Sequence, residues 1–358
     1  MPHRRTTFSK FIIEDQRSRP NPDPELTGLL NDIQTACKFI ASAVSRGALY
    51  YPPRSSMSVN PSGEDYRKLD AIANDIMLRE CEWGGKLCGM LFEGIEEPYR
   101  IPASYPRGRY LLAFDPLEGA ESLDVNDTVG TIFSVLRAPD GMTEPSAADF
   151  LRPGTEQIAA GFALYGPVSI IVITLGNGVH GFTLDREIGA YTLTHPEMRI
   201  PEETRDIAID PSNERTWEAP IRYYIDECIQ GKAGLRQVDF NMRWVDSLVA
   251  EVHRLLVRGG LLIYPQDMRD AFKHGSLHLL YEANPIALIV EQAGGLASTG
   301  RGRILETDPS SVQQCVPVIL GSRREVERLV RYHETADRGE ELKFKTPLFN
   351  TRSLFRPV

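Results

Sequence analysis

At 358 residues, 42% hydrophobic and 25% charged, the chain can bury a large core, and its length favours two domains. A net charge of −9 argues against a nucleic-acid surface, and no apolar run approaches the length of a membrane span. An amino terminus without an apolar signal segment, together with five cysteines in no CxxC pair, predicts reduced thiols and a cytoplasmic protein.

The first 22 residues are polar and interrupted by proline, which predicts a loosely held arm. A helix is predicted to follow, with Asp23 as its N-cap, Pro24 at its first position and Glu25 in its first turn. Apolar residues recur at helical spacing up to Gly47, which should end the helix.

Residues 50–62 are rich in proline, serine and asparagine, which predicts a loop. The helical spacing of apolar residues predicts a second helix over Tyr66–Glu80. Glu64 and Asp70 fall at its start, where charged residues are most often solvated caps. Asp70 follows the apolar Leu69 within the periodic stretch, which adds weight to a functional role.

The stretch around Asp115 organises the rest of the chain. The apolar run Tyr110–Phe114 predicts a buried strand that stops at Pro116, which lacks a backbone donor. Asp115 and Glu118 then lie three residues apart, and the residues after Gly119 could open a helix whose N–H groups face an anion. Oxygen ligands beside an anion site suit Mg²⁺ bridging protein to phosphate, although an ordinary strand-to-turn junction has the same spacing.

Residues 159–194 predict a β meander with a hairpin turn at 176–178. The segment 195–201 is interpreted as the domain boundary. The predicted units are an amino-terminal domain over residues 1–198, a carboxyl-terminal domain over 199–336 and a tail over 337–358.

The second half alternates helices with strands, which predicts an α/β domain. The expected elements, in order, are a helix over 245–258, a strand over 261–264, an apolar segment over 277–281, a helix from Asn284 to Gly294, a strand over 316–320 and a helix after Ser322.

Two motifs carry a family resemblance. Asp115-Pro-Leu-Glu-Gly119 resembles the Asp-Pro-Ile/Leu-Asp-Gly-Ser/Thr signature of the lithium-sensitive sugar and inositol phosphatases. With Val129-Gly-Thr-Ile-Phe-Ser-Val-Leu-Arg137 after it, the chain resembles class 1 fructose-1,6-bisphosphatases from about Arg5 to His333.

The resemblance implies an α/β (α+β) fold, a two-domain layered αβαβα sandwich that assembles as a homotetramer. The implied activity is Mg²⁺-dependent hydrolysis of the 1-phosphate of fructose 1,6-bisphosphate to fructose 6-phosphate, in gluconeogenesis or Calvin-type carbohydrate metabolism. Two or more Mg²⁺ ions per subunit are implied, with Mn²⁺ as an alternative, and a sugar phosphate is the implied partner.

The resemblance also implies roles for single residues. Glu64, Asp70 and Glu93 would serve catalysis, the first two by orienting the attacking water. The implied metal ligands are Glu93, Asp115, the carbonyl of Leu117, Glu118 and Glu282. The implied substrate contacts are Glu118, Gly119, Ala120, Glu121, Asp210, Arg243, Tyr264, Lys273 and Ser276. An adenosine-monophosphate (AMP) inhibitor site would use Thr27, Arg109, Tyr110 and Arg137.

Two of these residues also have interpretations that are independent of the resemblance. Glu282 is a lone acid in the apolar stretch 279–285, so it needs a partner or a metal. Arg243 would reach across a subunit interface by resemblance, whereas the commoner fate of an arginine is a surface salt bridge.

The chain departs from the family pattern at functional positions. Glu118 replaces an aspartate, and Ala120-Glu121-Ser122 replaces Ser-Ser-Asn. Asp210 replaces an asparagine, and Ser276 replaces a lysine or arginine, with Lys273 nearby.

These departures leave two alternatives open. One is a related sugar phosphatase, acting on sedoheptulose bisphosphate or on a monophosphate; the other is a catalytically weak paralogue that binds phosphosugars. Asp23 and Pro24 replace the Thr-Gly that precedes the inhibitor-site helix, and an acid there competes with a phosphate. A packing helix that binds no nucleotide is therefore favoured.

Overall fold

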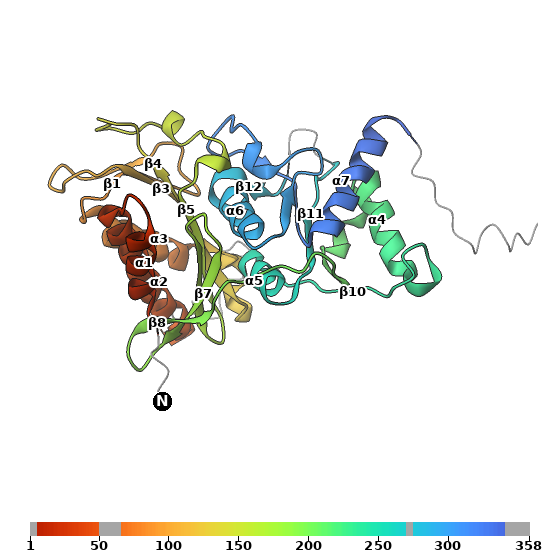
Figure 1. The fold of residues 1–358 in the computed structure, drawn as a ribbon, viewed down its shortest axis with the longest axis horizontal. Coiled ribbons are helices and arrows are strands. Elements are labelled where there is room, and N and C mark those ends of the chain that lie inside the picture. The colour runs from red at the N-terminus through yellow and green to blue at the C-terminus, as the bar shows by residue number, and fades with distance from the viewer. Residues whose placement is uncertain (1–5, 50–65, 270–274, 341–358) are drawn as a thin grey trace, which may run out of the picture.

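Helices and sheets alternate in five layers over the part of the chain that the structure describes, residues 6–49, 66–269 and 275–340 (Figure 1). In this computed structural model, an eight-stranded and a five-stranded sheet have helices between them and on both outer faces. The strand order is β2-β1-β3-β4-β5-β6-β7-β8 in the large sheet and β10-β9-β11-β15-β13 in the small one. The predicted αβαβα sandwich is confirmed.

The helices are α1 (Phe8–Ser18), α2 (Pro24–Arg46), α3 (Tyr66–Glu82), α4 (Ala219–Gln230), α5 (Leu248–Arg258), α6 (Asn284–Gln292) and α7 (Arg323–Asp337). The large sheet contains β1 (Leu87–Phe92), β2 (Tyr99–Arg100), β3 (Tyr110–Glu118), β4 (Val129–Arg137), β5 (Ala159–Tyr165), β6 (Ser169–Thr174), β7 (Val179–Asp185) and β8 (Ala190–His195). The small sheet contains β9 (Asp206–Ala208), β10 (Asn241–Met242), β11 (Leu261–Tyr264), β13 (Leu296–Ser298) and β15 (Val318–Gly321), and β12 (Leu277–His278) pairs with β14 (Cys315–Val316). Of the described helices, none combines the length and the apolar character that a membrane crossing requires.

Hydrophobic cores fill the interfaces between the layers. Helices α1, α2 and α3 bury residues such as Leu29 against one face of the large sheet. Helices α5 and α6 pack between the two sheets, where Phe162 of β5 belongs to the same core as Leu262 of β11. Helices α4 and α7 cover the outer face of the small sheet, with Tyr224 at the centre of that core. Strand β6 is buried along its whole length because both faces of the large sheet are covered.

The predicted domain boundary lies in the segment that joins β8 to β9. The core between the sheets draws residues from both sides of that segment, including Phe162 before it and Leu255 after it. The two halves of the chain therefore share buried apolar surface, which favours a fixed relative position of the two sheets.

Several predicted elements are confirmed. Asp23 caps α2, where its side chain accepts hydrogen bonds from the N–H groups of Glu25 and Leu26, and the helix ends at Gly47 as predicted. Helix α3 extends two residues beyond the predicted end, and the β meander is present as β5 to β8. Gly176 and Gly178, both with positive φ, lie in the turn between β6 and β7.

The prediction of a loosely held amino-terminal arm is wrong, because residues 8–18 form α1. Thr7 caps this helix, and its hydroxyl accepts a hydrogen bond from the N–H of Lys10. Phe8 and Ile12, four residues apart, present one apolar face and are 1% and 0% exposed. The ring of Phe8 lies 5.2 Å from that of Phe182 in β7, so α1 is part of the first core.

Other boundaries also differ. Strand β3 does not stop at Pro116 but continues to Glu118 through a register shift. The segment after β12 is a π-helical turn, Leu279–Ala283, which runs directly into α6, so Asn284 is helical rather than a cap. Pro317 divides the strand predicted over 316–320 into β14 and β15. Helix α4 was not predicted.

The burial of α1 predicts a large stability effect. Ile12→Ala should lower the free energy of unfolding by roughly 2–5 kcal/mol, the usual range for truncating a fully buried isoleucine. Ile13→Ala is the matched control because Ile13 is 37% exposed, and it should change the free energy by less than about 0.5 kcal/mol. Urea denaturation of both variants measures the difference, and equal midpoints would contradict the packing of α1.

Candidate active site

Two of the expected carboxylates lie at the ends of neighbouring parallel strands. Strands β1 and β3 run parallel, and Phe92 pairs with Phe114 in their register. Glu93 and Asp115 each follow the paired phenylalanine, so the register brings them to the same edge of the large sheet. The N–H of Glu93 donates to the carbonyl of Phe114 at 3.3 Å, which fixes the backbone at this point.

An irregularity in β3 orients Asp115. The pairing with β4 shifts between Asp115 and Glu118, and Pro116 lies inside the shift. The carboxylate of Asp115 accepts a hydrogen bond from the N–H of Leu117 at 3.0 Å, and the hydroxyl of Thr131 donates to the carbonyl of Pro116 at 2.8 Å. Asp115 is only 3% exposed. Because these two hydrogen bonds satisfy buried polar groups at the irregularity, the strand can continue past Pro116.

Glu282 approaches from the π-helical turn before α6. It is 7% exposed, and its carboxylate accepts a hydrogen bond from the N–H of His278 at 2.6 Å. The Nδ1 atom of His278 lies 3.4 Å from a carboxylate oxygen of Glu282 and 3.4 Å from one of Glu93. His278 thus joins two residues that the resemblance implied as metal ligands.

His278 was not predicted from the sequence, although Ser276 and Lys273 on the same segment were. The only available signal was the spacing of four residues between His278 and Glu282, which places two side chains on one helical face.

These carboxyl groups disfavour one another's ionisation. Burial raises the pKa of Asp115, and the nearby charges of Glu93, Glu282 and Glu118 raise it further. Burial and Glu282 likewise raise the pKa of Glu93. A hydrogen bond with Cys315 and, as a smaller cause, one with Glu282 raise the pKa of His278 to about 10. The site therefore has an excess of negative charge that a cation would relieve.

The chemistry of this group suits a hard cation, since Glu93, Asp115 and Glu282 supply carboxylate oxygens. Within residues 6–49, 66–269 and 275–340, no three His, Cys, Asp or Glu side chains already form an arrangement that could hold a metal ion. The pKa shifts of Glu93 and Asp115, rather than completed ligand geometry, indicate that the residues fit a cation.

Glu118 is held by the start of α5. Its two carboxylate oxygens accept hydrogen bonds from the N–H groups of Leu248, at 2.9 Å, and Val249, at 3.4 Å. These donors belong to the first turn of α5, which Ser247 caps. Burial raises the pKa of Glu118 to about 8, although these hydrogen bonds act in the opposite direction. The carboxylate therefore ties the edge of β3 to α5.

The residues after the signature form a short helix, as predicted, but a 3₁₀ helix spanning Ala120–Val125. Gly119 has φ +76°, a left-handed conformation that a side chain would strain. Ala120 is buried and Glu121 is exposed. The N–H of Ser122 donates to the carbonyl of Gly119 at 3.0 Å, so that donor is occupied within the turn.

Asp210 also caps a helix. It precedes a 3₁₀ helix, Pro211–Thr216, and accepts hydrogen bonds from the N–H and hydroxyl of Ser212, both at 2.9 Å, and from the side-chain amide of Asn213 at 2.6 Å. Three donors thus already satisfy its carboxylate.

The remaining substrate-side residues lie on or beside the small sheet. Tyr264 ends β11, and its ring lies 5.5 Å from that of Trp244. Burial raises the pKa of Tyr264, and the charges of Glu118 and Glu282 add to the shift, which places the tyrosine near the carboxylates. Arg243 is half exposed and its Nε lies 3.6 Å from Asp206, while Ser276 is exposed.

The two residues expected to orient water are only partly described. Asp70 lies on α3 and is partly buried, which raises its pKa, and its charge also raises the pKa of Glu93. Helix α3 therefore brings the charge of Asp70 within electrostatic range of Glu93. Glu64 and Lys273 lie outside the described residues.

The positions expected to bind an inhibitor converge on Asp23. Tyr110 donates its hydroxyl proton to the carboxylate of Asp23, and the guanidinium groups of Arg109 and Arg137 lie at 3.4 and 3.3 Å. Burial opposes ionisation, but these contacts and the N–H of Leu26 outweigh it and lower the pKa of Asp23. Thr27 donates to the backbone carbonyl of Asp23. An internal carboxylate thus occupies the start of α2.

Comparisons with known proteins agree over nearly the whole chain. Residues 6–196 match the family described as fructose-1-6-bisphosphatase, N-terminal domain, and residues 200–334 match the corresponding C-terminal domain. The chain is 56% identical to "Fructose-1,6-bisphosphatase class 1" of Methylacidiphilum infernorum (isolate V4), over 99% of both lengths. It is 51% identical to the protein of that name from Hydrogenophilus thermoluteolus, over 98% of this chain and 97% of the other.

Solved structures show the same similarity. The structure of Leishmania major fructose-1,6-bisphosphatase in holo form matches with a TM-score of 0.83 and 35% identity. The apo form of the same enzyme matches with a TM-score of 0.80 and 34% identity. Each match covers 92% of this chain and 99% of the other.

Proposed function

The chain belongs to the class 1 fructose-1,6-bisphosphatase family, and from this premise we propose that it hydrolyses the 1-phosphate of fructose 1,6-bisphosphate. Water attacks phosphorus, the bond between phosphorus and the sugar oxygen breaks, and the products are fructose 6-phosphate and inorganic phosphate. The protein is a phosphoric monoester hydrolase of carbohydrate metabolism.

One observation supports this function from the structure itself. Glu93, Asp115 and Glu282 come from three separate segments. Glu93 and Asp115 follow paired residues of β1 and β3, and the Nδ1 atom of His278 lies 3.4 Å from both Glu93 and Glu282. A metal-dependent phosphatase uses such a group of oxygen ligands to hold the cation that stabilises the attacking and leaving oxygens. The identity of 56% to a curated enzyme favours the bisphosphate over the alternative substrates considered from the sequence.

We further propose that the cation is Mg²⁺, with two or more ions per subunit. The proposed ligands are Glu93, Asp115, the carbonyl of Leu117, Glu118 and Glu282. When bound, it would supply positive charge to the phosphoryl oxygens and to the leaving oxygen. Asp115 is preset for this role because the N–H of Leu117 fixes one of its oxygens.

The protein side chains provide the remaining steps. Asp70 and Glu64 would accept a proton from the attacking water, and burial, which raises the pKa of Asp70, makes its carboxylate a stronger base. Tyr264 and Arg243 would hold the distal phosphate, with Lys273 or Ser276 beside them. His278 would orient the carboxylates of Glu93 and Glu282, since its Nδ1 atom lies 3.4 Å from each of them.

The position of Arg243 is relevant to the oligomeric state. It is half exposed and binds only Asp206 among the described carboxylates, so it could contribute to a neighbouring subunit. We propose a cytoplasmic homotetramer, the assembly that the family resemblance implied.

The substrate is tested with a panel of sugar phosphates. Purified protein with Mg²⁺ should release phosphate from fructose 1,6-bisphosphate at least tenfold faster, in kcat/KM, than from sedoheptulose 1,7-bisphosphate or fructose 6-phosphate. Colorimetric phosphate release measures all three. A preference for either other substrate would overturn the assignment, and absence of turnover with every substrate would favour a binding paralogue.

The cation site is tested by removing single charges. Asp115→Asn and Glu282→Gln should each lower Mg²⁺-dependent kcat by at least about 10²-fold, the scale of one electrostatic stabiliser. Their thermal stability without metal should not fall, because each removes mutual repulsion. Glu291→Gln is the control for charge, since Glu291 pairs with Arg303 away from this group. Full activity in either site variant would contradict the metal assignment.

We propose that Asp23 blocks inhibition by AMP, because its carboxylate already holds the donors a phosphate would need. Asp23→Ser keeps a helix cap and frees Arg109 and Arg137. It should lower the AMP concentration for half-inhibition at least tenfold. Glu25→Gln, which loses only an ion pair with Arg109, should not. Strong AMP inhibition of the unmodified enzyme would show that Asp23 is displaced.

A further inference from the structure

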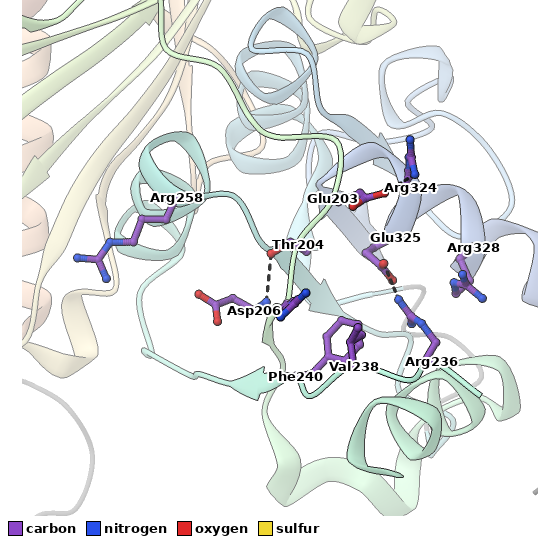
Figure 2. Close-up of a pocket in the computed structure, with 11 residues that line it drawn as sticks. Glu203, Thr204, Asp206, Arg236, Val238, Phe240, Arg258, Arg324, Glu325 and Arg328 are labelled. Atoms are coloured by element: carbon purple, nitrogen blue, oxygen red, sulfur yellow. Dashed lines mark hydrogen bonds and ion pairs between the residues drawn. The ribbon is translucent and has the colours of Figure 1, made fainter. Parts of the chain in front are cut away.

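A cavity of about 580 Å³ lies beside the small sheet, between the segment that enters β9 and the first turns of α7 (Figure 2). This volume lies within the range of small-molecule sites. Its lining contains three acidic residues and five arginines, namely Arg205, Arg236, Arg258, Arg324 and Arg328. We call it the arginine pocket.

The arginine pocket is separate from the candidate active site. Strands β9 and β11 run parallel, with Leu261 paired to Ile207. Asp206 begins β9 at the pocket, whereas Asp210 follows the carboxyl end of β9 and Tyr264 ends β11. The pocket therefore lies at the opposite end of these two strands from Asp210 and Tyr264. Arg243 lies between the two regions, since its Nε is 3.6 Å from Asp206.

Two of the pocket's acids are already paired. Glu325, which is 5% exposed, accepts hydrogen bonds from Arg236 at 2.6 Å and from the hydroxyl of Tyr224 at 2.7 Å. Figure 2 shows the contact between Glu325 and Arg236. Glu203 forms an ion pair with Arg324. Neither acid is available to neutralise another arginine.

The third acid, Asp206, is engaged as well. Its carboxylate lies 3.7 Å from Arg254 and 3.6 Å from Arg243, neither of which lines the pocket. It also accepts a hydrogen bond from the amide of Asn241 at 3.0 Å. All three pocket acids thus have cationic partners.

Three guanidinium groups remain without a carboxylate among the described residues: those of Arg205, Arg258 and Arg328. The Nε of Arg328 is buried and has no hydrogen-bond partner in the described part of the chain. In Figure 2 the guanidinium of Arg258 points away from the side of the pocket formed by Arg328. Arg205 and Arg328 are therefore the surplus charges that a ligand could engage.

The pocket therefore has a local excess of positive charge, although the whole chain has a net charge of −9. A buried guanidinium donor without an acceptor is unfavourable, and a bound anion would supply one. Val238 and Phe240 add an apolar wall, and the guanidinium of Arg236 lies 4.5 Å from the centre of the Phe240 ring. An apolar wall beside cations suits a ligand with a carbon skeleton.

We propose that the arginine pocket binds a small organic anion carrying at least two negative charges, as phosphate or carboxylate groups. The proposal is independent of the hydrolysis assigned above, since the pocket shares no lining residue with the proposed active site.

Isothermal titration calorimetry of the full chain without Mg²⁺ tests this. The probes are 2-phosphoglycolate, tricarballylate and sulfate, which distinguish phosphate, carboxylate and inorganic sources of charge. At least one organic probe should bind one per chain with a Kd below about 1 mM, and more tightly than sulfate. The double variant Arg205→Gln/Arg328→Gln should weaken it at least tenfold and leave hydrolytic activity unchanged.

Two controls make the result specific. Arg17→Gln/Arg186→Gln removes the same charge from α1 and from the turn between β7 and β8, and it should leave binding unchanged. In Figure 1, α1 and β8 lie at the other end of the molecule from α7. Tyr264→Phe perturbs the proposed substrate side without removing a partner of a pocket acid, and it should also leave binding unchanged. No binding by either organic probe would overturn the proposal. Equal weakening in the remote double variant, or loss in Tyr264→Phe alone, would overturn it as well.

Discussion

Mutual repulsion among closely placed carboxylates is the constraint on which the rest of this structure depends. Two unit charges ~5 Å apart repel by roughly 3 kcal/mol at an effective dielectric of ~20. Glu93, Asp115 and Glu282 are nevertheless held near one another, with His278 as the one described cation that forms ion pairs with any of them. Only a rigid scaffold can do this. The parallel register of β1 with β3 and the π-helical turn before α6 provide it.

The layered fold makes that scaffold rigid. Helices on both faces of the large sheet bury β3 almost completely, so Asp115 cannot turn toward solvent. The core between the sheets joins β5 to α5 and α6, and α6 is continuous with the turn that carries Glu282. The positions of the carboxylates are thus set by apolar packing at some distance from them.

Three acids that depart from the family pattern share one physical role. Asp23 lies at the start of α2, Asp210 at the start of a 3₁₀ helix and Glu118 at the start of α5, and each accepts hydrogen bonds from backbone N–H groups there. A carboxylate is stabilised at a helix start by these donors and by the helix dipole. Glu118 ties β3 to α5, and Asp23 ties α2 to β3 through Tyr110, whereas Asp210 bonds only within its own 3₁₀ helix.

The sequence by itself determined the family and the layered fold class, because the signature around Asp115 carries them. It also predicted the cap and limits of α2 and the β meander, because these depend on local spacing and turn chemistry. The acids Glu93, Asp115 and Glu282 were singled out through the same resemblance. It missed α1 and α4, and it ended β3 at Pro116, since local propensity cannot report tertiary burial or a bulge that bypasses proline. Only the tertiary structure decided that Glu118 binds the start of α5, that Asp23 binds Tyr110 and that His278 joins two carboxylates. Those contacts link residues distant in sequence, or depend on a π-helical turn, and side-chain direction at such points is set by packing rather than by sequence spacing.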